Sequence, residues 1–139
     1  MPVVSIVTNS TLSLEVKVTV SKAITSAAAT ILKTPAAHVH VHLSDAQFLS
    51  FGGDYETPCA VITVKGASMQ ISEEARKKLV SFMGPLLQET CSCDARHTTT
   101  HFIEIPVENI AVGDQIMVFS GLRAGLVSDS TPNVRRSMS

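Results

Sequence analysis

The sequence predicts an α/β (α+β) domain in which two β-α-β units share one four-stranded sheet, with two helices on one face. The chain of 139 residues is long enough for a single domain with its own core. Hydrophobic residues make up 45% of the chain and charged residues 17%, as in an ordinary globular protein. The apolar segments fall into two similar halves, each with the order strand, helix, strand.

The first half combines two clear strands with a long segment of mixed pattern. Strands are expected at residues 3–8 and at His38–Leu43. Between them, residues 12–32 show both the alternation of a strand and the spacing of a helix. The alanines at 27–29 favour a helix, and the pattern leaves its N-terminus open.

The second half repeats this order with a more distinct helix. The expected elements are a strand at Cys59–Val64, a helix at Ser72–Glu89 and a strand at Phe102–Ile105. Ser72 is a candidate N-cap, because the two glutamates that follow it suit the positive end of a helix. Gly84 and Pro85 lie inside the helical segment and predict a kink or a break there.

The last residues of the chain differ from the rest in composition. Residues 121–139 hold Gly, Ser, Asp and Pro together with Arg135 and Arg136, and few side chains that could pack. Such a composition is typical of a segment without fixed structure, and mobility is expected beyond Leu126. The sequence therefore predicts one domain at residues 1–120 and a polar, flexible tail at residues 121–139.

Charge and hydropathy exclude several classes of function. The net charge is −1 and there are no long runs of Lys or Arg, so neither a nucleic-acid partner nor a basic membrane patch is expected. No apolar stretch approaches the length of a membrane span, so membrane insertion is not expected. The N-terminus lacks the features of a secretory signal, which predicts a cytoplasmic protein or export without a signal peptide.

Three cysteines, Cys59, Cys91 and Cys93, are too few and too unevenly spaced for a disulfide framework. Their spacing matches neither a zinc finger nor a redox CxxC motif. Free cysteines usually pack as small hydrophobic residues, and this is the favoured interpretation of all three.

Three histidines, His38, His40 and His42, alternate with aliphatic residues. Residues two apart on a strand share a face, so the three imidazoles are expected on one side of the sheet. Imidazole is a common zinc ligand, which makes a zinc site one interpretation. Such a site needs a further ligand and supporting hydrogen bonds, and the sequence identifies neither. The pattern therefore favours a polar face that is open to solvent.

Pro2 is a candidate catalytic residue. The initiator Met is commonly removed before a small residue, and its removal would leave a free secondary amine on the pyrrolidine ring of Pro2. An α-amino group has an ordinary pKa of roughly 7.7–8.0, and apolar surroundings lower it because they disfavour the cation. Such an amine could act as a general base. The alternative is that Pro2 is an incidental second residue.

Four segments resemble the macrophage migration inhibitory factor family. They are MPVVSIVTN at the start, then AATILKTPAAHV, FGGDYETPCAV and IPVENIAVGDQIMVF. The last of them is more similar to the D-dopachrome tautomerase branch of that family. The resemblance covers roughly residues 2–119, with its motifs in the order that the family has.

The resemblance implies a fold of two β-α-β units, with a helix at residues 12–32, and a homotrimer whose sheets surround a central channel. It implies that Pro2 is the base of a keto-enol tautomerase acting on small aromatic keto acids such as phenylpyruvate, or on D-dopachrome. No metal or organic cofactor is expected. Members of the family are also secreted cytokines that bind a cell-surface receptor, so the alternative is a signalling protein with a vestigial pocket.

The resemblance also assigns pocket positions, and several depart from the family pattern. The substrate-carboxylate lysine corresponds to Lys33, or in an ungapped alignment to Thr34. The segment Gly66-Ala67 replaces a pocket-wall isoleucine. A tyrosine and an asparagine of the pocket fall on His101 and Ile103, positions at which the dopachrome branch departs as well, while Val112 keeps the apolar wall. The candidate site therefore consists of Pro2, Lys33, Thr34, Gly66, Ala67, His101, Ile103 and Val112.

Overall fold

The computed structural model describes residues 1–117 and contains the two β-α-β units that the sequence predicts. Residues 118–139, which include the expected tail, lie outside the described part. The first unit is β1 (Val3–Thr8), α1 (Leu14–Ile31) and β2 (His40–Ser44). The second is β3 (Ala60–Ala67), α2 (Glu73–Cys91) and β4 (Thr98–Ile105). Three short 3-10 helices, η1 (Ala36–His38), η2 (Ala95–His97) and η3 (Val107–Asn109), and a small hairpin of β5 (Ala111–Val112) and β6 (Gln115–Ile116) complete the described part.

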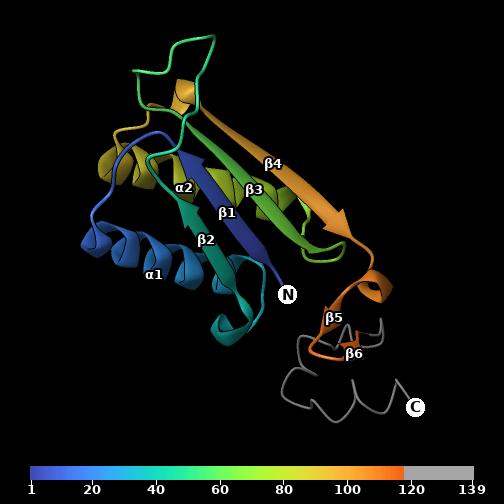
Figure 1. Ribbon diagram of the computed structural model, residues 1–139. Helices are drawn as coiled ribbons and strands as arrows, with labels where there is room; N and C mark the ends of the chain where they lie inside the picture. The colour runs from blue at the N-terminus through green and yellow to red at the C-terminus, as the bar shows by residue number, and fades with distance from the viewer. Residues whose placement is uncertain (118–139) are drawn as a thin grey trace.

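The four long strands form one mixed sheet in the order β2-β1-β3-β4. The two outer pairs, β1 with β2 and β3 with β4, are parallel, and the two central strands, β1 and β3, are antiparallel. Both helices lie on the same face of this sheet (Figure 1). Since β1 and β3 are central, each is hydrogen bonded on both sides, while β2 and β4 are edge strands.

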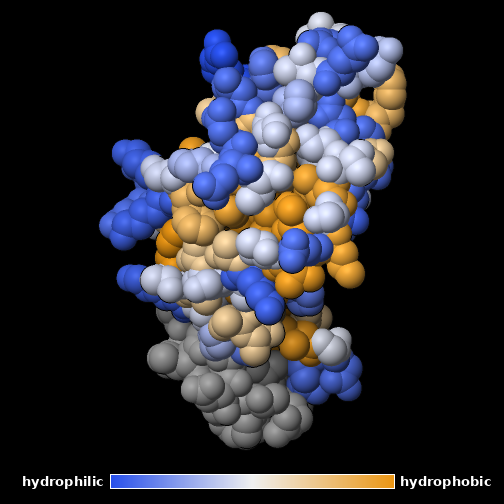
Figure 2. Space-filling model, turned by 90° about the vertical axis from the view of Figure 1, so that its left-hand side faces the viewer, coloured by the Kyte–Doolittle hydropathy of each residue, from blue (hydrophilic) through white to orange (hydrophobic). Residues whose placement is uncertain are grey.

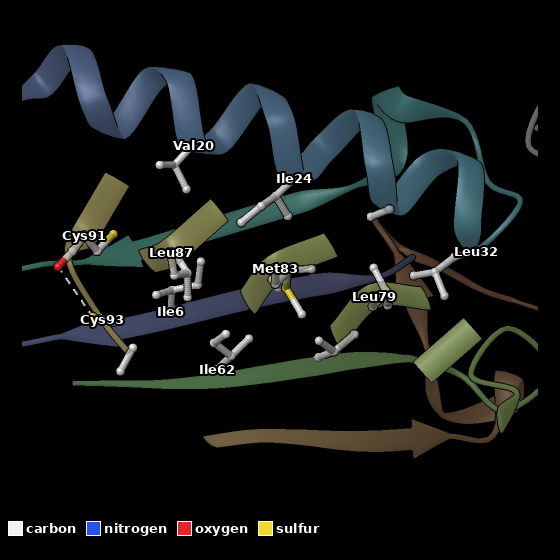
Figure 3. Close-up of a cluster of buried hydrophobic side chains, with 14 of the residues drawn as sticks. Ile6, Val20, Ile24, Leu32, Ile62, Leu79, Met83, Leu87, Cys91 and Cys93 are labelled. Carbon is white, nitrogen blue, oxygen red and sulfur yellow. Dashed lines mark hydrogen bonds between the residues drawn. The ribbon is translucent and has the colours of Figure 1, made fainter. Parts of the chain in front are cut away.

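The core lies between the helices and the covered face of the sheet. Every second residue of β1 is buried, including Val4 and Ile6. Buried side chains of α1 and α2 point at this face, and Figure 3 shows how those of the two helices and the sheet meet. Apolar residues at helical spacing therefore form one buried stripe along each helix. In α1 this stripe consists of Val20, Ile24 and Ala28.

The structure confirms a helix in the ambiguous segment and the N-cap of the second helix. The Ser13 hydroxyl accepts a hydrogen bond from the N–H of Val16, so α1 begins at Leu14. The Ser72 hydroxyl accepts one from the N–H of Ala75 at the start of α2. Both serines satisfy donors that a helix N-terminus leaves unpaired.

The break predicted at Pro85 is absent, because α2 continues from Glu73 to Cys91. Proline removes one hydrogen bond to the carbonyl four residues earlier, which here belongs to Ser81. Both Pro85 and Ser81 are exposed, so water can satisfy that carbonyl. Burial of the opposite side of the helix, at Met83 and Leu87, holds the helix together through the proline.

Strand boundaries differ from the prediction by more than one residue at three places. β2 starts at His40 rather than at His38, because residues 36–38 form η1. β3 extends to Ala67. β4 begins four residues earlier than predicted, at Thr98, and its three β-branched threonines suit a strand although they are not apolar.

The three cysteines are free and buried, which confirms that they pack inside the protein. The Thr8 hydroxyl, also fully buried, donates a hydrogen bond of 2.8 Å to the carbonyl of Cys59. Burial raises the pKa of the Cys59 and Cys91 thiols, so both favour the neutral and unreactive form. Within residues 1–117, no helix is both long and apolar enough to cross a membrane.

We expect Met83→Ala to lower the free energy of unfolding by about 2–5 kcal/mol, because the truncation leaves a cavity under α2. Met83 is only 1% exposed. The matched variant is Met69→Ala, at a methionine that is 42% exposed, and it should change stability by less than about 0.5 kcal/mol. Urea denaturation of both variants measures the difference. Equal losses would contradict the assignment of the core.

We expect Asp94 to contribute to stability in a pH-dependent manner. A side-chain hydrogen bond from Arg96, helped by the N–H of the same residue, lowers the pKa of Asp94 to about 2. The contribution is therefore complete above the ordinary aspartate pKa of about 3.9 and disappears as the pH falls to about 2.

The variant Asp94→Asn should consequently lose less stability than the wild type when urea denaturation is repeated between about pH 5 and pH 2. The control Glu108→Gln changes an exposed carboxylate that forms no ion pair within residues 1–117, and it should follow the wild type. If Asp94→Asn also follows the wild type, the ion pair does not contribute.

Candidate active site

Pro2 is fixed at the start of the central strand β1. Its side chain is less than 2% exposed, and its carbonyl accepts a hydrogen bond of 3.0 Å from the N–H of His40. The ladder between β1 and β2 therefore extends to Pro2 itself. Because the strand is also paired with β3, the nitrogen of Pro2 is held in place by backbone hydrogen bonds rather than by a flexible chain end.

Pro2 lies beside Gly66 on the face of the sheet that the helices cover. Val3 pairs with Lys65 in the antiparallel ladder, and one further step along the same register brings Pro2 opposite Gly66. Residues opposite each other on antiparallel strands point to the same face. That face is the buried one, since Val4 lies next along it.

Ile71 takes the space that a side chain at position 66 would occupy. A Cβ atom added to Gly66 would lie 3.0 Å from Cδ1 of Ile71. Ile71 is only 2% exposed, so its side chain is an aliphatic wall next to Pro2. The resemblance implies that the pocket-wall isoleucine is lost at Gly66-Ala67. In the structure, Ile71, five residues further along the chain, places its side chain in the space next to Gly66.

The surroundings of the N-terminus disfavour a positive charge. Burial lowers the pKa of the α-amino group of Met1 below its ordinary value. Pro2 is more buried than Met1, so the nitrogen that Met1 removal would convert into an amine lies in apolar surroundings. An amine with a lowered pKa is a better general base at neutral pH.

Lys33 and Thr34 lie at the C-terminus of α1, at the end of the sheet where Pro2 begins. Lys33 has a φ of 55°, and the N–H of Thr34 donates to the carbonyl of Ala29, so the two close the helix in a left-handed cap. A hydrogen bond from Lys78 lowers the pKa of Glu74, and the charge of Lys33 lowers it further. The ammonium of Lys33 is thus near the first turn of α2, while Thr34 is buried.

His101 and Ile103 lie on the other face of the sheet. Phe102 between them packs against the core, so its two neighbours point away from the helices. They pair with Thr63 and Lys65 of β3, the strand that separates β4 from β1 and its Pro2. A single chain therefore does not bring His101 or Ile103 into contact with Pro2.

Ala67 and Val112 lie at the end of the sheet that carries the N-terminus. Ala67, at the end of β3, is buried and pairs with Ile105 at the end of β4. Val112 is exposed in the hairpin of β5 and β6, which follows β4 (Figure 1). Gly113 has a φ of 65° at the first position of its two-residue turn, where glycine is favoured.

The histidine prediction is correct in part. His40 and His42 are exposed on the face of the sheet opposite the helices, whereas His38 belongs to η1 and not to the strand. The prediction that all three share a strand face is therefore wrong, because the chain turns through η1 before β2 begins. Within residues 1–117, no three His, Cys, Asp or Glu side chains are grouped so that they could hold a metal ion.

We expect Gly66→Val to destabilise the protein by about 1–3 kcal/mol, because the new side chain meets Ile71. Ile71→Ala alone should cost about 2–5 kcal/mol through the cavity that it leaves. The double variant should lose clearly less than the sum of the two, since each change accommodates the other. Chemical denaturation measures all three, and additive losses would show that the two positions do not share this space.

The family model "Macrophage migration inhibitory factor (MIF)" matches residues 1–119. The search of curated proteins gave no significant match.

Several solved structures share the fold at low sequence identity. A macrophage migration inhibitory factor of Toxoplasma gondii is 20% identical with a TM-score of 0.76, and the match covers 83% of this chain and 99% of the other. A macrophage migration inhibitory factor from Oncomelania hupensis is 18% identical, with a TM-score of 0.74, and the match covers 84% of this chain and 97% of the other. A protein crystallised after inactivation by 2-oxo-3-pentynoate is 21% identical, with a TM-score of 0.74 and coverage of 85% and 97%.

The family model covers most of the chain, and the observed sheet order and helix layer agree with the fold of these structures. The chain belongs to the macrophage migration inhibitory factor family and has its tautomerase fold.

Proposed function

We propose that this protein is a cofactor-independent keto-enol tautomerase whose general base is the amine of Pro2 after removal of Met1. The observation that carries the proposal is the burial of Pro2 at the start of a doubly paired strand, in surroundings that lower the pKa of an amine. Membership of the family supports it.

The proposed reaction moves one proton on a small aromatic keto acid such as phenylpyruvate, or on D-dopachrome. The neutral amine of Pro2 takes a proton from the carbon next to the carbonyl, and the resulting ammonium returns a proton to the enolate oxygen. The same steps in reverse convert the enol to the ketone. Proton transfer by the single amine of Pro2 needs no metal and no organic cofactor.

The substrate would lie at the end of the sheet, between Pro2 and the hairpin of β5 and β6. Ile71, together with Gly66 and Ala67, would provide an apolar floor, and Val112 an apolar wall. Lys33 and Thr34 lie at the same end and would contribute the polar side that attracts the carboxylate.

We propose a homotrimer, because His101 and Ile103 can line a pocket only if it belongs to a neighbouring chain. Both point away from Pro2 of their own chain. β4 is an edge strand of eight residues, and such edges commonly pair with another chain. Exposed hydrophobic side chains, among them Ile103 and Val112, are available for contact. Figure 2 views the molecule from the left-hand side of Figure 1 and shows hydrophobic surface across the middle of that face.

The alternative proposal is a cytokine-like signalling protein that binds a cell-surface receptor and retains only a vestigial pocket. The pocket positions Gly66, His101 and Ile103 depart from the pattern of the inhibitory factor, and this departure is the feature that raises the alternative. It would require a cytoplasmic protein that is exported without a signal peptide. The two proposals share the fold and the trimer, so a measurement of tautomerase activity distinguishes them.

We expect the purified chain, with Met1 removed as shown by intact mass, to catalyse ketonisation or enolisation of phenylpyruvate or D-dopachrome. Pro2→Gly should reduce kcat/KM by about 100-fold or more, because it removes the ring amine that acts as base. Pro58→Gly, at the opposite end of the sheet, is the matched control and should retain activity. A wild type no faster than Pro2→Gly would exclude the enzyme.

The reagent 2-oxo-3-pentynoate tests the same amine without a turnover assay. It is a keto acid with an electrophilic alkyne, and a solved member of this fold was crystallised after inactivation by it. We expect one adduct per chain, on Pro2, detected as a mass increase of one reagent molecule and mapped by peptide analysis. Met1-retaining chain should not react, and labelling at a lysine or a cysteine instead would contradict a reactive Pro2.

A further inference from the structure

Gln70 contains a buried oxygen atom that has no partner. Its side-chain Oε1 is buried and accepts no hydrogen bond within residues 1–117. Buried amide oxygens in native proteins nearly always have a hydrogen-bond donor. The exception lies in the connection between β3 and α2, next to the residues that surround Pro2.

The orientation of the Gln70 amide is fixed by its other contacts. Its backbone N–H donates to the carbonyl of Ala67, and its Nε2 donates to the carbonyl of Leu32 at 3.5 Å. Turning the amide over would bring Oε1 against that carbonyl, where two acceptors would repel each other. Oε1 therefore points the other way, toward Gly66, and lies 3.8 Å from the position of a Cβ atom at that glycine.

On this face of the sheet, Gly66 lies between Glu104 of β4, its partner in the parallel ladder, and Pro2, which one further step of the β1–β3 register brings opposite it. Opposite residues in antiparallel strands have Cβ positions about 4.5–5.5 Å apart. Gly66 has no side chain, and the atoms nearest to its missing Cβ are Cδ1 and Cγ1 of Ile71, at 3.0 and 3.4 Å, followed by Oε1 of Gln70 at 3.8 Å. While Met1 is present, the nitrogen of Pro2 is a tertiary amide without a hydrogen and cannot donate to Oε1. Removal of Met1 converts it into an amine that carries one hydrogen, or two when protonated.

We propose that Gln70 is a positioning residue for the amine of Pro2, and that its Oε1 accepts the hydrogen bond that this amine donates once Met1 is removed. The inference rests on the proposed function only in requiring that Met1 is removed. This hydrogen bond provides Oε1 of Gln70 with a donor. It also orients the Pro2 amine so that the lone pair of its nitrogen points to the substrate.

Gln70 should act on the pKa of the Pro2 amine in a predictable direction. A carbonyl oxygen binds an ammonium more strongly than a neutral amine, so Gln70 raises this pKa and offsets part of the effect of burial. Loss of the acceptor should lower the pKa, and a carboxylate at the same place should raise it.

Other charged groups near this end of the sheet are unaffected by changes at Gln70. On the open face, His40 of β2 and Lys65 of β3 pair with Val3. On the covered face, Glu104 of β4 pairs with Gly66 in the ladder and lies 3.8 Å from Arg76 of α2. Lys33 lies at the end of α1. Because all five are kept in the variants, a shift reports the loss of Gln70.

The first test compares Gln70→Leu, Gln70→Glu and the control Gln88→Leu, which changes an exposed glutamine of α2. In the processed chain, the acid limb of the profile of kcat/KM against pH should move down by about one pH unit in Gln70→Leu. It should move up in Gln70→Glu, and Gln88→Leu should follow the wild type. An unchanged acid limb in both Gln70 variants would overturn the proposal.

A second test does not depend on activity. Thermal unfolding is measured for wild type and Gln70→Leu, each with Met1 removed and with Met1 retained by inhibiting methionine aminopeptidase. Both forms of Gln70→Leu lose the bond from Nε2 to the carbonyl of Leu32, but only the processed form also loses the bond to Pro2, so the loss of stability should be clearly larger when Met1 is removed. The same effect in both forms would overturn the proposal. If every form is inactive, the tautomerase function fails, and this comparison still decides the role of Gln70.

Discussion

The pairing of β1 on both sides is the constraint on which the rest of the structure depends. A residue next to the chain end is normally free to move, yet Pro2 is tied to β2 through the N–H of His40 and follows the register that joins β1 to β3. At the other end of the strand, the buried Thr8 hydroxyl donates to the carbonyl of Cys59. A strand held at both ends and on both edges gives the N-terminal nitrogen a fixed position, which a general base requires.

Packing on the covered face determines what surrounds that nitrogen. The helices bury alternate residues of β1, so Pro2 shares its face with Val4 and Ile6. Gly66 leaves a space in the next strand, and Ile71 fills it within 3.0 Å of the missing Cβ. The result is an apolar environment in which the charged form of an amine is disfavoured. The opposite face of the sheet carries the exposed His40 and His42 and does not take part in this environment.

Periodicity in the sequence was sufficient to predict the two units, because alternation and helical spacing reflect burial on one face. It placed β2 two residues too early, since His38 continues the alternating pattern into a 3-10 turn. It missed the start of β4, where threonines form a strand without apolar side chains. Pro2 was identifiable from its position, whereas Ile71 and Gln70 were not, because their closeness to Pro2 depends on the register between β1 and β3. The left-handed backbone of Lys33 was equally hidden, since its residue type does not favour it.

The claim that most needs measurement is that the strand holds the Pro2 amine in surroundings that keep it neutral near neutral pH. Titration of the processed chain, labelled with ¹⁵N-proline and followed by NMR, reports this amine directly, because no other proline nitrogen carries a hydrogen. We expect a pKa below the ordinary α-amino range of roughly 7.7–8.0. A pKa within or above that range, or a Pro2 nitrogen that carries no hydrogen because Met1 is kept, would contradict the account.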